Sequence, residues 1–404
     1  MDKFRILFVG DPSYPISNTG FGIATAKIIE GLVKSERFRI LHLPRGMLAH
    51  HVAPKDLPFT VYVPPVSDPN GWHYCGTIAD WENPHLIIFE SDPQSISEWR
   101  KNTQVRRVPN LVHCPVEGAP LLRPWADEMK MIQPQGRITC YTEFARQALY
   151  SGMETTEHPI EVLGLGLDHA NFRKYAPAER NRIRALLGWT DKFVVMNVAR
   201  NAGRKMLPRL MDAMQIVHAS HPEALLYLHT QAFENFYLGG HNLLELRRQK
   251  GMEDYCFFYQ KLRDAMQGIP YEANPPDDPL GLIDFYNAAD LFVSVSGAEG
   301  FNLPNCEAAA CGLPVMAPMY SGGWEVAQHF ARGIPVDNFE THPSGTRMAA
   351  VRPQMVADCI MEDMENRDLL AERARNGQAY VQRFKWQPTV DRLVELAIEL
   401  CEKA

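Results

Sequence analysis

Short apolar runs alternate with amphipathic stretches along most of the chain. The run at residues 6–9 has the length of a strand, and residues 23–33 after it carry apolar positions at helical spacing. This alternation is typical of parallel sheets covered by helices. The other predicted strands are residues 86–90, 108–113, 137–141, 193–197, 224–229, 290–294 and 314–317, and further predicted helices are residues 144–151 and 207–218.

The predicted strands fall into two blocks, which indicates two doubly wound α/β domains. A chain of 404 residues is also long for a single core. Between the blocks, Gly164 and Gly166 interrupt an apolar strand, and we place the hinge there. We expect a first domain at residues 1–168 and a second at residues 169–386, with a C-terminal helix at about residues 387–404 packing back on the first.

The end of the chain has a different pattern. From residue 344 onward it predicts consecutive helices, with an interruption at residues 384–388. Pro388 in that interruption marks either a bend or the start of a new helix.

The amino-acid composition limits the functional classes to which this protein can belong. The chain is 46% hydrophobic and 22% charged with a formal net charge of −7, which is typical of a globular protein and argues against indiscriminate binding to polyanions. No apolar run is long enough for a transmembrane segment, and residues 6–9 are too short for a signal-peptide core. The eight cysteines have neither CxxC nor Cys/His ligand spacing, so we expect no disulfide framework and no structural zinc. A cytoplasmic protein is the expectation.

Gly20 follows the first predicted strand and opens the first helix. A glycine there lets backbone N–H groups approach a phosphate, and the helix dipole favours its charge. The loop lacks both the dinucleotide GxGxxG spacing and the lysine of a P-loop, which argues against a dehydrogenase or a P-loop enzyme. An ordinary turn remains the alternative.

A pair of cations follows the first strand of the second block. Arg200 and Lys205 are five positions apart after the strand at residues 193–199, where open α/β sheets bind ligands. Together they could neutralise a diphosphate without a metal ion. The alternative is a solvated basic turn, and Arg204 between them is predicted to be the solvated member.

Two glutamates follow a later strand of the same block. Glu299 lies in a glycine-containing loop, and Glu307 lies early in a helix that starts near Pro304. Both carboxylates can border one pocket, where they would accept hydrogen bonds from sugar hydroxyls while the loop N–H groups face an anion. An ordinary helix-end charge is the alternative for Glu307.

With these motifs the sequence resembles the large family four of retaining glycosyltransferases, which have the GT-B fold of two Rossmann-like domains and an interdomain cleft. The most specific matches are the E-x7-E motif at Glu299 and Glu307 and the Arg-x4-Lys pair at Arg200 and Lys205. Supporting matches are residues 165–168 with Phe172, residues 282–293, Gly322-Gly323 with Glu325, and residues 384–386.

The resemblance implies roles for the matching positions. Arg200 and Lys205 would bind the diphosphate of the sugar donor and stabilise the leaving group, and Glu307 would hold the ribose. Glu299 and the loop N–H groups would hold the transferred sugar and phosphate. The implied catalytic residues are Arg200, Lys205, Glu299 and His113, and the implied donor-binding residues are Gly20, Gly300, Phe301, Asn302, Leu303 and Glu307.

Two of the implied site residues, Gly20 and His113, belong to the first block. The sequence also departs from the family pattern at two loop positions. Gly20 would approach the diphosphate, and His113 would lie near the transferred sugar, although a lone histidine is more often structural. Asn302 stands where the family commonly has glycine, and Thr19-Gly20 stands where a double glycine is usual. These departures leave the preferred sugar donor open.

The predicted activity is transfer of a sugar from a nucleoside diphosphate sugar to an acceptor hydroxyl, with retention of anomeric configuration. No metal and no other cofactor is expected, because the cations would take the place of the ion, and Asp277-Asp278 in a proline-rich stretch is interpreted as a solvated turn. Alternatives are a sugar-nucleotide epimerase or hydrolase of the same fold and a non-catalytic nucleotide-sugar-binding protein.

The acceptor stays open between a glycan, a small molecule and a hydroxylated nucleic-acid base. The last is raised by a basic cluster beside Trp99, made of Arg100, Lys101, Arg106 and Arg107. A solvated helix face is the alternative interpretation of that cluster.

Overall fold

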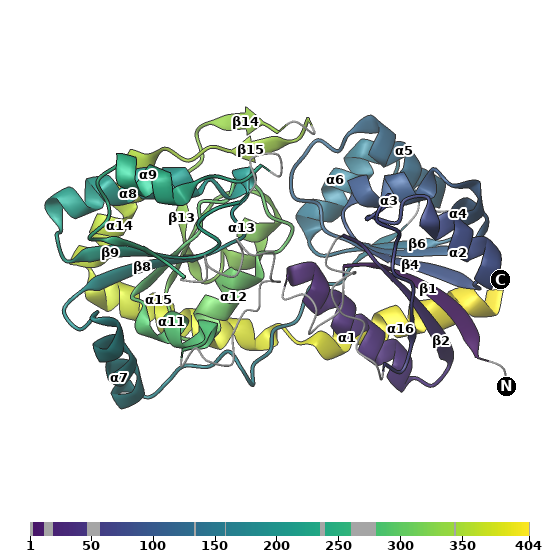
Figure 1. The fold of residues 1–404 in the computed structure, drawn as a ribbon, viewed down its shortest axis with the longest axis horizontal. Coiled ribbons are helices and arrows are strands. Elements are labelled where there is room, and N and C mark those ends of the chain that lie inside the picture. Colours follow the sequence, from purple (N-terminus) through teal and green to yellow (C-terminus); the bar gives the residue numbers. More distant parts are fainter. Residues whose placement is uncertain are drawn as a thin grey trace. The chain divides into compact units, whose positions relative to one another are not determined.

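The computed structural model describes residues 3–11, 19–46, 57–132, 135–157, 159–234, 239–259, 280–342 and 345–403. The chain divides into two compact units, each built around its own sheet (Figure 1). Unit 1 comprises Met1–Gly166, Ser344–Thr346 and Lys385–Ala404, and unit 2 comprises Leu167–Pro343 and Arg347–Phe384.

Unit 1 contains a seven-stranded parallel sheet in the order β3-β2-β1-β4-β5-β6-β7. Its strands are β1 (Phe4–Gly10), β2 (Phe38–Pro44), β3 (Thr60–Val61), β4 (Leu86–Glu90), β5 (Asn110–Cys114), β6 (Arg137–Cys140) and β7 (Ile160–Val162). Along β1, Ile6 and Phe8 enter one core while Leu7 and Val9 enter the other, because successive side chains point to opposite faces of a strand.

Helices cover both faces of this sheet (Figure 1). One face carries α1 (Gly20–Lys34) and α16 (Trp386–Lys403). Gly31 of α1 permits the close approach of these two helices, because a Cβ at this position would lie 2.1 Å from Val390 Cγ1. The other face carries α2 (Tyr74–Glu82), α3 (Pro93–Arg100), α4 (Thr103–Arg107), α5 (Arg123–Ile132) and α6 (Glu143–Met153).

Unit 2 contains a six-stranded parallel sheet in the order β10-β9-β8-β11-β12-β13. Its strands are β8 (Phe193–Val198), β9 (Ala224–His229), β10 (Cys256–Phe258), β11 (Leu291–Val293), β12 (Val315–Pro318) and β13 (Ala331–Ile334). A separate antiparallel pair is formed by β14 (Phe339–Thr341) and β15 (Arg347–Ala349).

The helices of unit 2 again cover both faces of the sheet (Figure 1). One face carries α8 (Leu207–Ser220), α9 (Leu243–Gln249) and α14 (Pro353–Glu365), and the other carries α11 (Leu282–Ala288), α12 (Leu303–Ala310) and α15 (Arg367–Tyr380). The remaining elements are α7 (Pro177–Leu187), α13 (Ser321–Ala327) and the 3-10 turns η2 (Gly203–Lys205) and η4 (Val381–Arg383).

The predicted fold class is confirmed: both units are doubly wound parallel α/β sheets, and every predicted strand is present. The prediction of helices alone from residue 344 onward is wrong, because residues 347–349 form β15 before the helices begin. The strand β15 is three residues long and pairs with the equally short β14, so no long apolar run marks it in the sequence. The interruption near Pro388 marks a new helix start, since α16 begins at Trp386.

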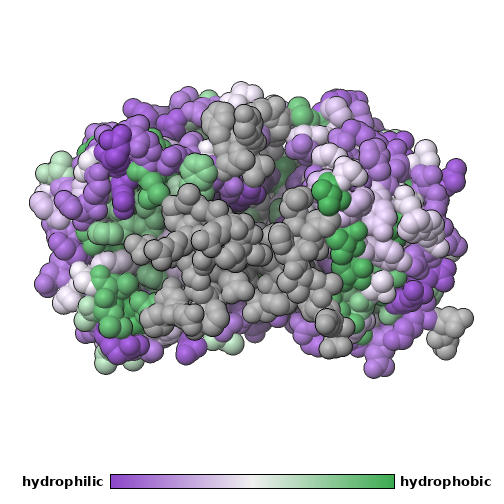
Figure 2. All heavy atoms as spheres, viewed as in Figure 1, coloured by the Kyte–Doolittle hydropathy of each residue, from purple (hydrophilic) through white to green (hydrophobic). Residues whose placement is uncertain are grey.

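On the face shown in Figure 2, hydrophilic residues cover most of the described surface and apolar residues form separate patches. Among the helices of the described ranges, none is both long and apolar enough to cross a bilayer. All eight cysteines are free thiols with buried side chains.

Candidate functional site

The sheet of unit 2 reverses its winding between β8 and β11. These neighbouring strands are followed by helices on opposite faces, α8 after β8 and α12 after β11, so their loops diverge at the carboxyl edge of the sheet (Figure 1). Such a switch point is where open α/β sheets bind ligands. The two loops also touch, because Gly297 N donates a hydrogen bond to Arg204 O at 2.8 Å. The candidate residues of unit 2 lie on these loops.

Lys205 and Glu299 form a buried ion pair across the switch point. The Lys205 Nζ donates to Glu299 Oε1, and the two side chains are only 12% and 9% exposed. Arg204 completes the group, because its Nη1 donates to Glu299 Oε2 at 2.9 Å. The structure therefore brings Lys205 and Glu299 together, as the sequence predicted for residues of one site.

The charge of Glu299 depends on these two cations. Burial alone would raise its pKa, but the electrostatic attraction of Lys205 and Arg204, with a hydrogen bond from Lys205, lowers the pKa to about 2. Glu299 is therefore a carboxylate at neutral pH. A carboxylate held this firmly can accept hydrogen bonds from ligand hydroxyls without taking up a proton.

The prediction that Arg204 is the solvated cation of this loop is wrong. The Arg204 side chain is 27% exposed and bound to Glu299, whereas the Arg200 side chain is 63% exposed. Arg200 Nε lies 3.6 Å from Glu234 Oε2. Arg204 is drawn inward because the charge of Glu299 is buried, and a buried carboxylate requires close cations.

The backbone around Glu299 is shaped by the start of α13. Glu299 N donates to Ser321 Oγ at 2.9 Å, and Gly323 N donates to Glu299 O at 3.0 Å. A Cβ at position 323 would lie 2.8 Å from Glu299 Cβ, so glycine is required for this approach. This contact gives the Gly322-Gly323 pair a structural role as support for the glutamate loop.

Asn302 caps the amino end of α12 in a left-handed conformation, with a φ of 69°. Glycine takes this conformation most readily and asparagine is among the residues that tolerate it. Asn302, in place of the glycine that is common in the family, therefore preserves the backbone path. The side chain turns to the protein, since Asn302 Nδ2 donates to Ser294 Oγ at 3.3 Å. Gly300, Phe301 and Leu303 around it are buried.

Glu307 lies in α12 with its side chain buried beneath the loop. Tyr286 Oη donates to Glu307 Oε2 at 2.8 Å. Burial raises the pKa of Glu307 to about 7, and the tyrosine hydrogen bond partly offsets the rise. Unlike Glu299, Glu307 therefore titrates near neutrality.

The candidate residues of unit 1 lie at the carboxyl edge of its own sheet. Gly20 is the first residue of α1 and is exposed, and Thr19 Oγ1 caps this helix by accepting from Gly22 N at 3.0 Å. His113 near the end of β5 is fully buried, and its Nδ1 lies 2.9 Å from Thr139 Oγ1. Burial lowers the pKa of His113 to about 3, so the imidazole is neutral.

Comparison with known proteins adds independent information. Residues 277–345, which include Glu299 and Glu307, match the family described as "Glycosyl transferases group 1". The D-inositol 3-phosphate glycosyltransferase of Thermobispora bispora is 28% identical over 279 residues, covering 68% of this chain and 59% of that relative. The mannosylfructose-phosphate synthase of Agrobacterium fabrum is 27% identical over 200 residues, covering 47% of this chain and 39% of the relative.

Solved structures share the fold of this chain. The structure of HepE from Anabaena in complex with UDP and glucose superposes with a TM-score of 0.72 at 18% identity, covering 98% of this chain and 100% of that one. The sucrose-phosphate synthase of Thermosynechococcus elongatus gives a TM-score of 0.69 at 16% identity, with 100% of both chains covered. The two units have the GT-B fold of these solved structures. It spans little more than half the length of the first curated relatives that it matches.

The residues of the basic cluster beside Trp99 differ in burial. Trp99 is fully buried and stacks on Phe89, and Arg100 is buried with its Nε 3.5 Å from Glu128 Oε2. Arg106 also pairs with Glu128. Trp99 and Arg100 therefore belong to the core, and the exposed members of the cluster are Lys101, Arg106 and Arg107.

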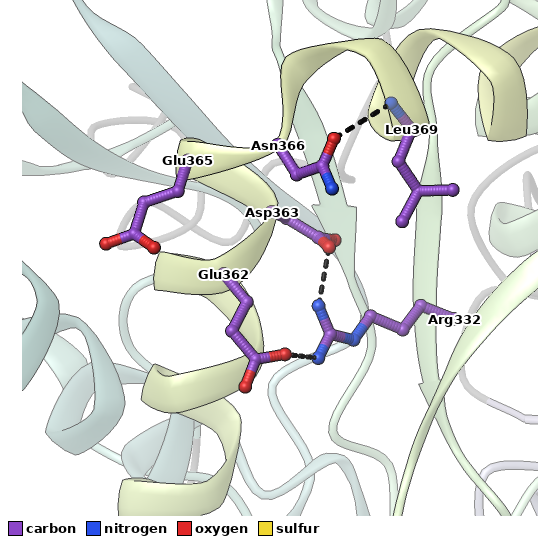
Figure 3. A pocket seen from close by; sticks show the side chains of 6 residues that line it. All are labelled: Arg332, Glu362, Asp363, Glu365, Asn366 and Leu369. Atoms are coloured by element: carbon purple, nitrogen blue, oxygen red, sulfur yellow. Dashed lines mark hydrogen bonds and ion pairs between the residues drawn. The ribbon is translucent and has the colours of Figure 1, made fainter.

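A pocket of about 400 Å³ in unit 2 lies away from the switch point, against β13 and the junction of α14 and α15 (Figure 3). Arg332 Nη1 lies 2.6 Å from Asp363 Oδ1, and Arg332 also pairs with Glu362. Arg373 pairs with the same Asp363. Because Glu362 and Asp363 of this pocket already hold arginines, it is built as a structural ion-pair network and is poorly suited to a diphosphate.

In the ranges that the structure describes, no three His, Cys, Asp or Glu side chains gather as a metal site. The Asp277-Asp278 pair, interpreted from the sequence as a solvated turn, lies outside those ranges.

Sequence reasoning missed two contributors to the site. Tyr286, the partner of Glu307, comes from α11, which precedes β11, and no motif linked them. Ser321 Oγ accepts the hydrogen bond from Glu299 N. Its φ is 64°, a conformation that a serine in the sequence does not indicate. The glycine pair beside Ser321 was the only available signal.

Proposed function

We propose that this chain is a retaining glycosyltransferase that moves a sugar from a nucleoside diphosphate sugar to an acceptor hydroxyl. The observation that carries the proposal is the buried group of Lys205, Arg204 and Glu299 at the switch point of unit 2. It places cations and a permanent carboxylate beside the amino end of α12. A leaving diphosphate needs the cations, and a polyhydroxylated sugar needs the carboxylate.

Arg200 and Lys205 would stabilise the leaving diphosphate. An ammonium carries three hydrogen-bond donors, so Lys205 can keep its bond to Glu299 while it donates to a phosphate oxygen. The exposed Arg200 side chain has the reach to close over the same phosphates from the solvent side. The N–H groups of Asn302 and Leu303 at the start of α12 add the positive end of the helix dipole.

The two glutamates would bind the two ends of the sugar donor. Glu299 would accept hydrogen bonds from hydroxyls of the transferred sugar, because its carboxylate stays ionised. Glu307 would accept the ribose hydroxyls, with Tyr286 Oη orienting it. Gly300 and Phe301 would position the loop between them, while Gly20 and His113 would contribute from unit 1.

The chemistry would then rest on charge stabilisation. As the bond between the anomeric carbon and the phosphate oxygen breaks, charge grows on the phosphate, where preorganised cations lower the barrier most. The acceptor hydroxyl would attack on the same face, and the leaving phosphate oxygen would take its proton. Attack on the face that the phosphate leaves preserves the anomeric configuration, and no protein nucleophile or metal ion is assigned a step.

Relatives suggest which ligands to try first. The inositol phosphate and fructose phosphate names of the sequence relatives point to polyhydroxylated acceptors, and HepE was solved with UDP-glucose. Each of these ligands belongs to the named protein. For this chain they define a starting set of sugar donors and acceptors.

The test is a screen of nucleoside diphosphate release across UDP-, GDP- and ADP-sugars with and without polyol, sugar phosphate and glycan acceptors. The expected result is acceptor-dependent release with one preferred sugar donor, and NMR of the product showing the anomeric configuration of that donor. The matched control is Arg200→Ala, which should release far less product from an intact fold. Inverted product, or no binding of any nucleotide sugar by calorimetry, would refute the proposal.

A further inference from the structure

We infer that Arg204 is a positioning residue, which holds the Glu299 carboxylate in place while Lys205 is shared with the diphosphate of a sugar donor. Arg204 stands inside the Arg-x4-Lys spacing, whose two ends alone were assigned to the diphosphate. The inference rests on the proposed function for the identity of the ligand. The contacts that support it all lie within unit 2.

Arg204 is tied to the loop of Gly297, Ala298 and Glu299 through both its side chain and its main chain. Its Nη1 donates to Glu299 Oε2 at 2.9 Å and to the carbonyl oxygen of Ala298 at 3.3 Å. Its own carbonyl oxygen accepts from Gly297 N at 2.8 Å. The guanidinium is therefore fixed relative to the carboxylate that it contacts.

The backbone of the same loop is also fixed. Glu299 N donates to Ser321 Oγ at 2.9 Å, and Glu299 O accepts from Gly323 N at 3.0 Å. On the other side of the loop, Ala349 N donates to Gly297 O at 2.8 Å. Because the main chain is held in this way, the direction of the carboxylate depends on the partners of its two oxygens. Lys205 binds Oε1 and Arg204 binds Oε2.

The two cations differ in what a ligand can draw from them. The Lys205 ammonium has three donors on a flexible stem, so it can turn one of them toward a phosphate. The Arg204 guanidinium is planar and already spans a carboxylate and a carbonyl oxygen. A diphosphate that binds Lys205 weakens the attraction between Lys205 and Glu299, and its own negative charge disfavours an ionised carboxylate nearby. Arg204 then supplies the cation that Glu299 still requires.

Burial makes this second cation necessary. The Glu299 side chain is only 9% exposed, and burial raises its pKa, whereas Lys205 and Arg204 lower the pKa to about 2. A buried carboxylate that loses a cation takes up a proton or turns toward water. Either change would remove the acceptor proposed for hydroxyls of the transferred sugar. Loss of Arg204 should therefore affect the sugar part of the donor more than its nucleotide part.

Arg209 provides a matched control on α8. Its side chain is 30% exposed, against 27% for Arg204. It also binds one carboxylate and one backbone carbonyl, since it pairs with Glu340 and its Nη1 donates to Val351 O at 3.3 Å. Glu340, however, lies in the β14 strand and has no proposed contact with a ligand. Arg209→Gln thus repeats the loss of an arginine without disturbing Glu299.

The test is calorimetric binding of UDP-glucose and of UDP at pH 8, or of the equivalent pair for whichever sugar donor binds. Arg204→Gln should weaken binding of the nucleotide sugar about tenfold or more and binding of the nucleoside diphosphate less than about threefold. Arg204→Lys should recover most of the sugar-dependent loss, because both side-chain bonds of Arg204 come from a single nitrogen. Arg209→Gln should change neither affinity. Circular dichroism and thermal unfolding verify that each variant is folded.

A double variant shows whether Arg204 acts through Glu299. In the Glu299→Gln background, adding Arg204→Gln should weaken the nucleotide sugar by less than about threefold further, because the carboxylate is already gone. This comparison buries neither charge, so it also serves if Arg204→Gln alone is unstable. Equal weakening of UDP-glucose and UDP in Arg204→Gln, or the full sugar-dependent loss in the Glu299→Gln background, overturns the role of Arg204 and leaves the proposed function standing. Failure of every nucleotide sugar to bind the wild type refutes the proposed function and this inference with it.

Discussion

Lys205 donates from its ammonium to Glu299 Oε1, and both side chains are almost completely withdrawn from solvent. The pair joins the loops after β8 and β11, so one interaction links the cation proposed to bind phosphate to the carboxylate proposed to bind the sugar. It also means that substitutions here change folding and chemistry together.

The first prediction separates these two effects. Lys205→Met should lower the free energy of unfolding by about 3 kcal/mol, because it leaves a buried carboxylate with Arg204 as its main cation. The double variant Lys205→Met/Glu299→Gln should recover most of this stability, since neither buried charge remains. Its turnover should stay at least about a hundredfold below wild type, because the leaving group has lost its cation. Urea unfolding and steady-state kinetics measure the two quantities.

The ion pair of Lys205 and Glu299 also predicts that the free energy of unfolding falls at acidic pH. The pKa of Glu299 is about 2 in the folded chain against an ordinary 4.5, so its contribution is complete above pH 4.5 and is lost as the pH falls toward 2. This contribution is about 3 kcal/mol. Glu299→Gln should therefore flatten the loss of stability between pH 4.5 and 2. If the variant keeps the full acid dependence, other carboxylates cause it.

Arg200 offers a cleaner test of transition-state stabilisation. Its side chain is 63% exposed, so Arg200→Ala should leave the midpoint of thermal unfolding within about two degrees of wild type. Turnover should nevertheless fall by about 10²- to 10³-fold, the effect of removing one preorganised group from a developing charge. The control is Arg248→Ala on α9, an arginine 68% exposed in a surface ion pair, which should change neither quantity. Equal activity in the two variants would remove Arg200 from the mechanism.

Metal dependence can be tested by removal. Since Arg200 and Lys205 are proposed to neutralise the diphosphate, activity should persist in excess chelator and should not rise on adding magnesium or manganese. The measurement is product formation by the purified chain after dialysis against chelator. Loss of activity that either ion restores would show that the cations are not sufficient.

Asn302 predicts an order of stabilities. Because its φ is 69°, Asn302→Ala places a residue with a Cβ and no compensating side-chain bond in the left-handed region, at a cost of about 1 to 2 kcal/mol. Asn302→Gly should be more stable than Asn302→Ala, since glycine adopts this conformation without strain. Ser294→Ala removes the 3.3 Å side-chain contact together with the 3.4 Å bond from Ser296 N, so its loss of stability is an upper limit on the share of that contact. Urea unfolding of the three variants gives the order, and an alanine variant as stable as the glycine variant would contradict it.

The sequence predicted the elements whose signals are local. The buried strands contain continuous apolar runs, as in residues 193–196, and parallel sheets covered on both faces require such runs. The β2 strand was missed although its residues are mostly apolar, because it follows α1 after only three residues and has no turn signal of its own. The hairpin of β14 and β15 was missed because three-residue strands have no measurable period.

The site was predictable only as far as its motifs reached. The spacing of Glu299 and Glu307 identified the loop and helix that carry them, but not which of the two stays ionised. That difference depends on Lys205 and Arg204 on one side and Tyr286 on the other, residues distant in sequence from the glutamates that they contact. Arg204 was assigned to solvent for the same reason, since its partner is 95 positions away. Tertiary contacts decide charge, and a single sequence does not display them.

The last prediction concerns Glu307 and pH. Burial raises the pKa of Glu307 to about 7 in the ligand-free chain, while ribose hydroxyls are best held by the carboxylate form. Affinity for a nucleotide sugar should therefore rise about tenfold between pH 6 and pH 8, because the carboxylate fraction increases as the pH passes the pKa. A nucleotide sugar is the right probe, since its diphosphate has no terminal group that titrates in this range.

Two variants assign this dependence to Glu307. Glu307→Gln should bind more weakly than wild type at pH 8 and show a flat profile from pH 6 to 8. Tyr286→Phe removes the hydrogen bond that opposes the rise in pKa, so its profile should keep its shape with a midpoint shifted to higher pH. The raised pKa of Glu307 also affects folding. A carboxyl whose pKa is raised in the folded chain lowers the free energy of unfolding as the pH rises from 4.5 through 7. Glu307→Gln should abolish that part of the decline. Calorimetric titration across pH and urea unfolding measure the two, and a pH-dependent affinity that survives in Glu307→Gln would place the titrating group elsewhere.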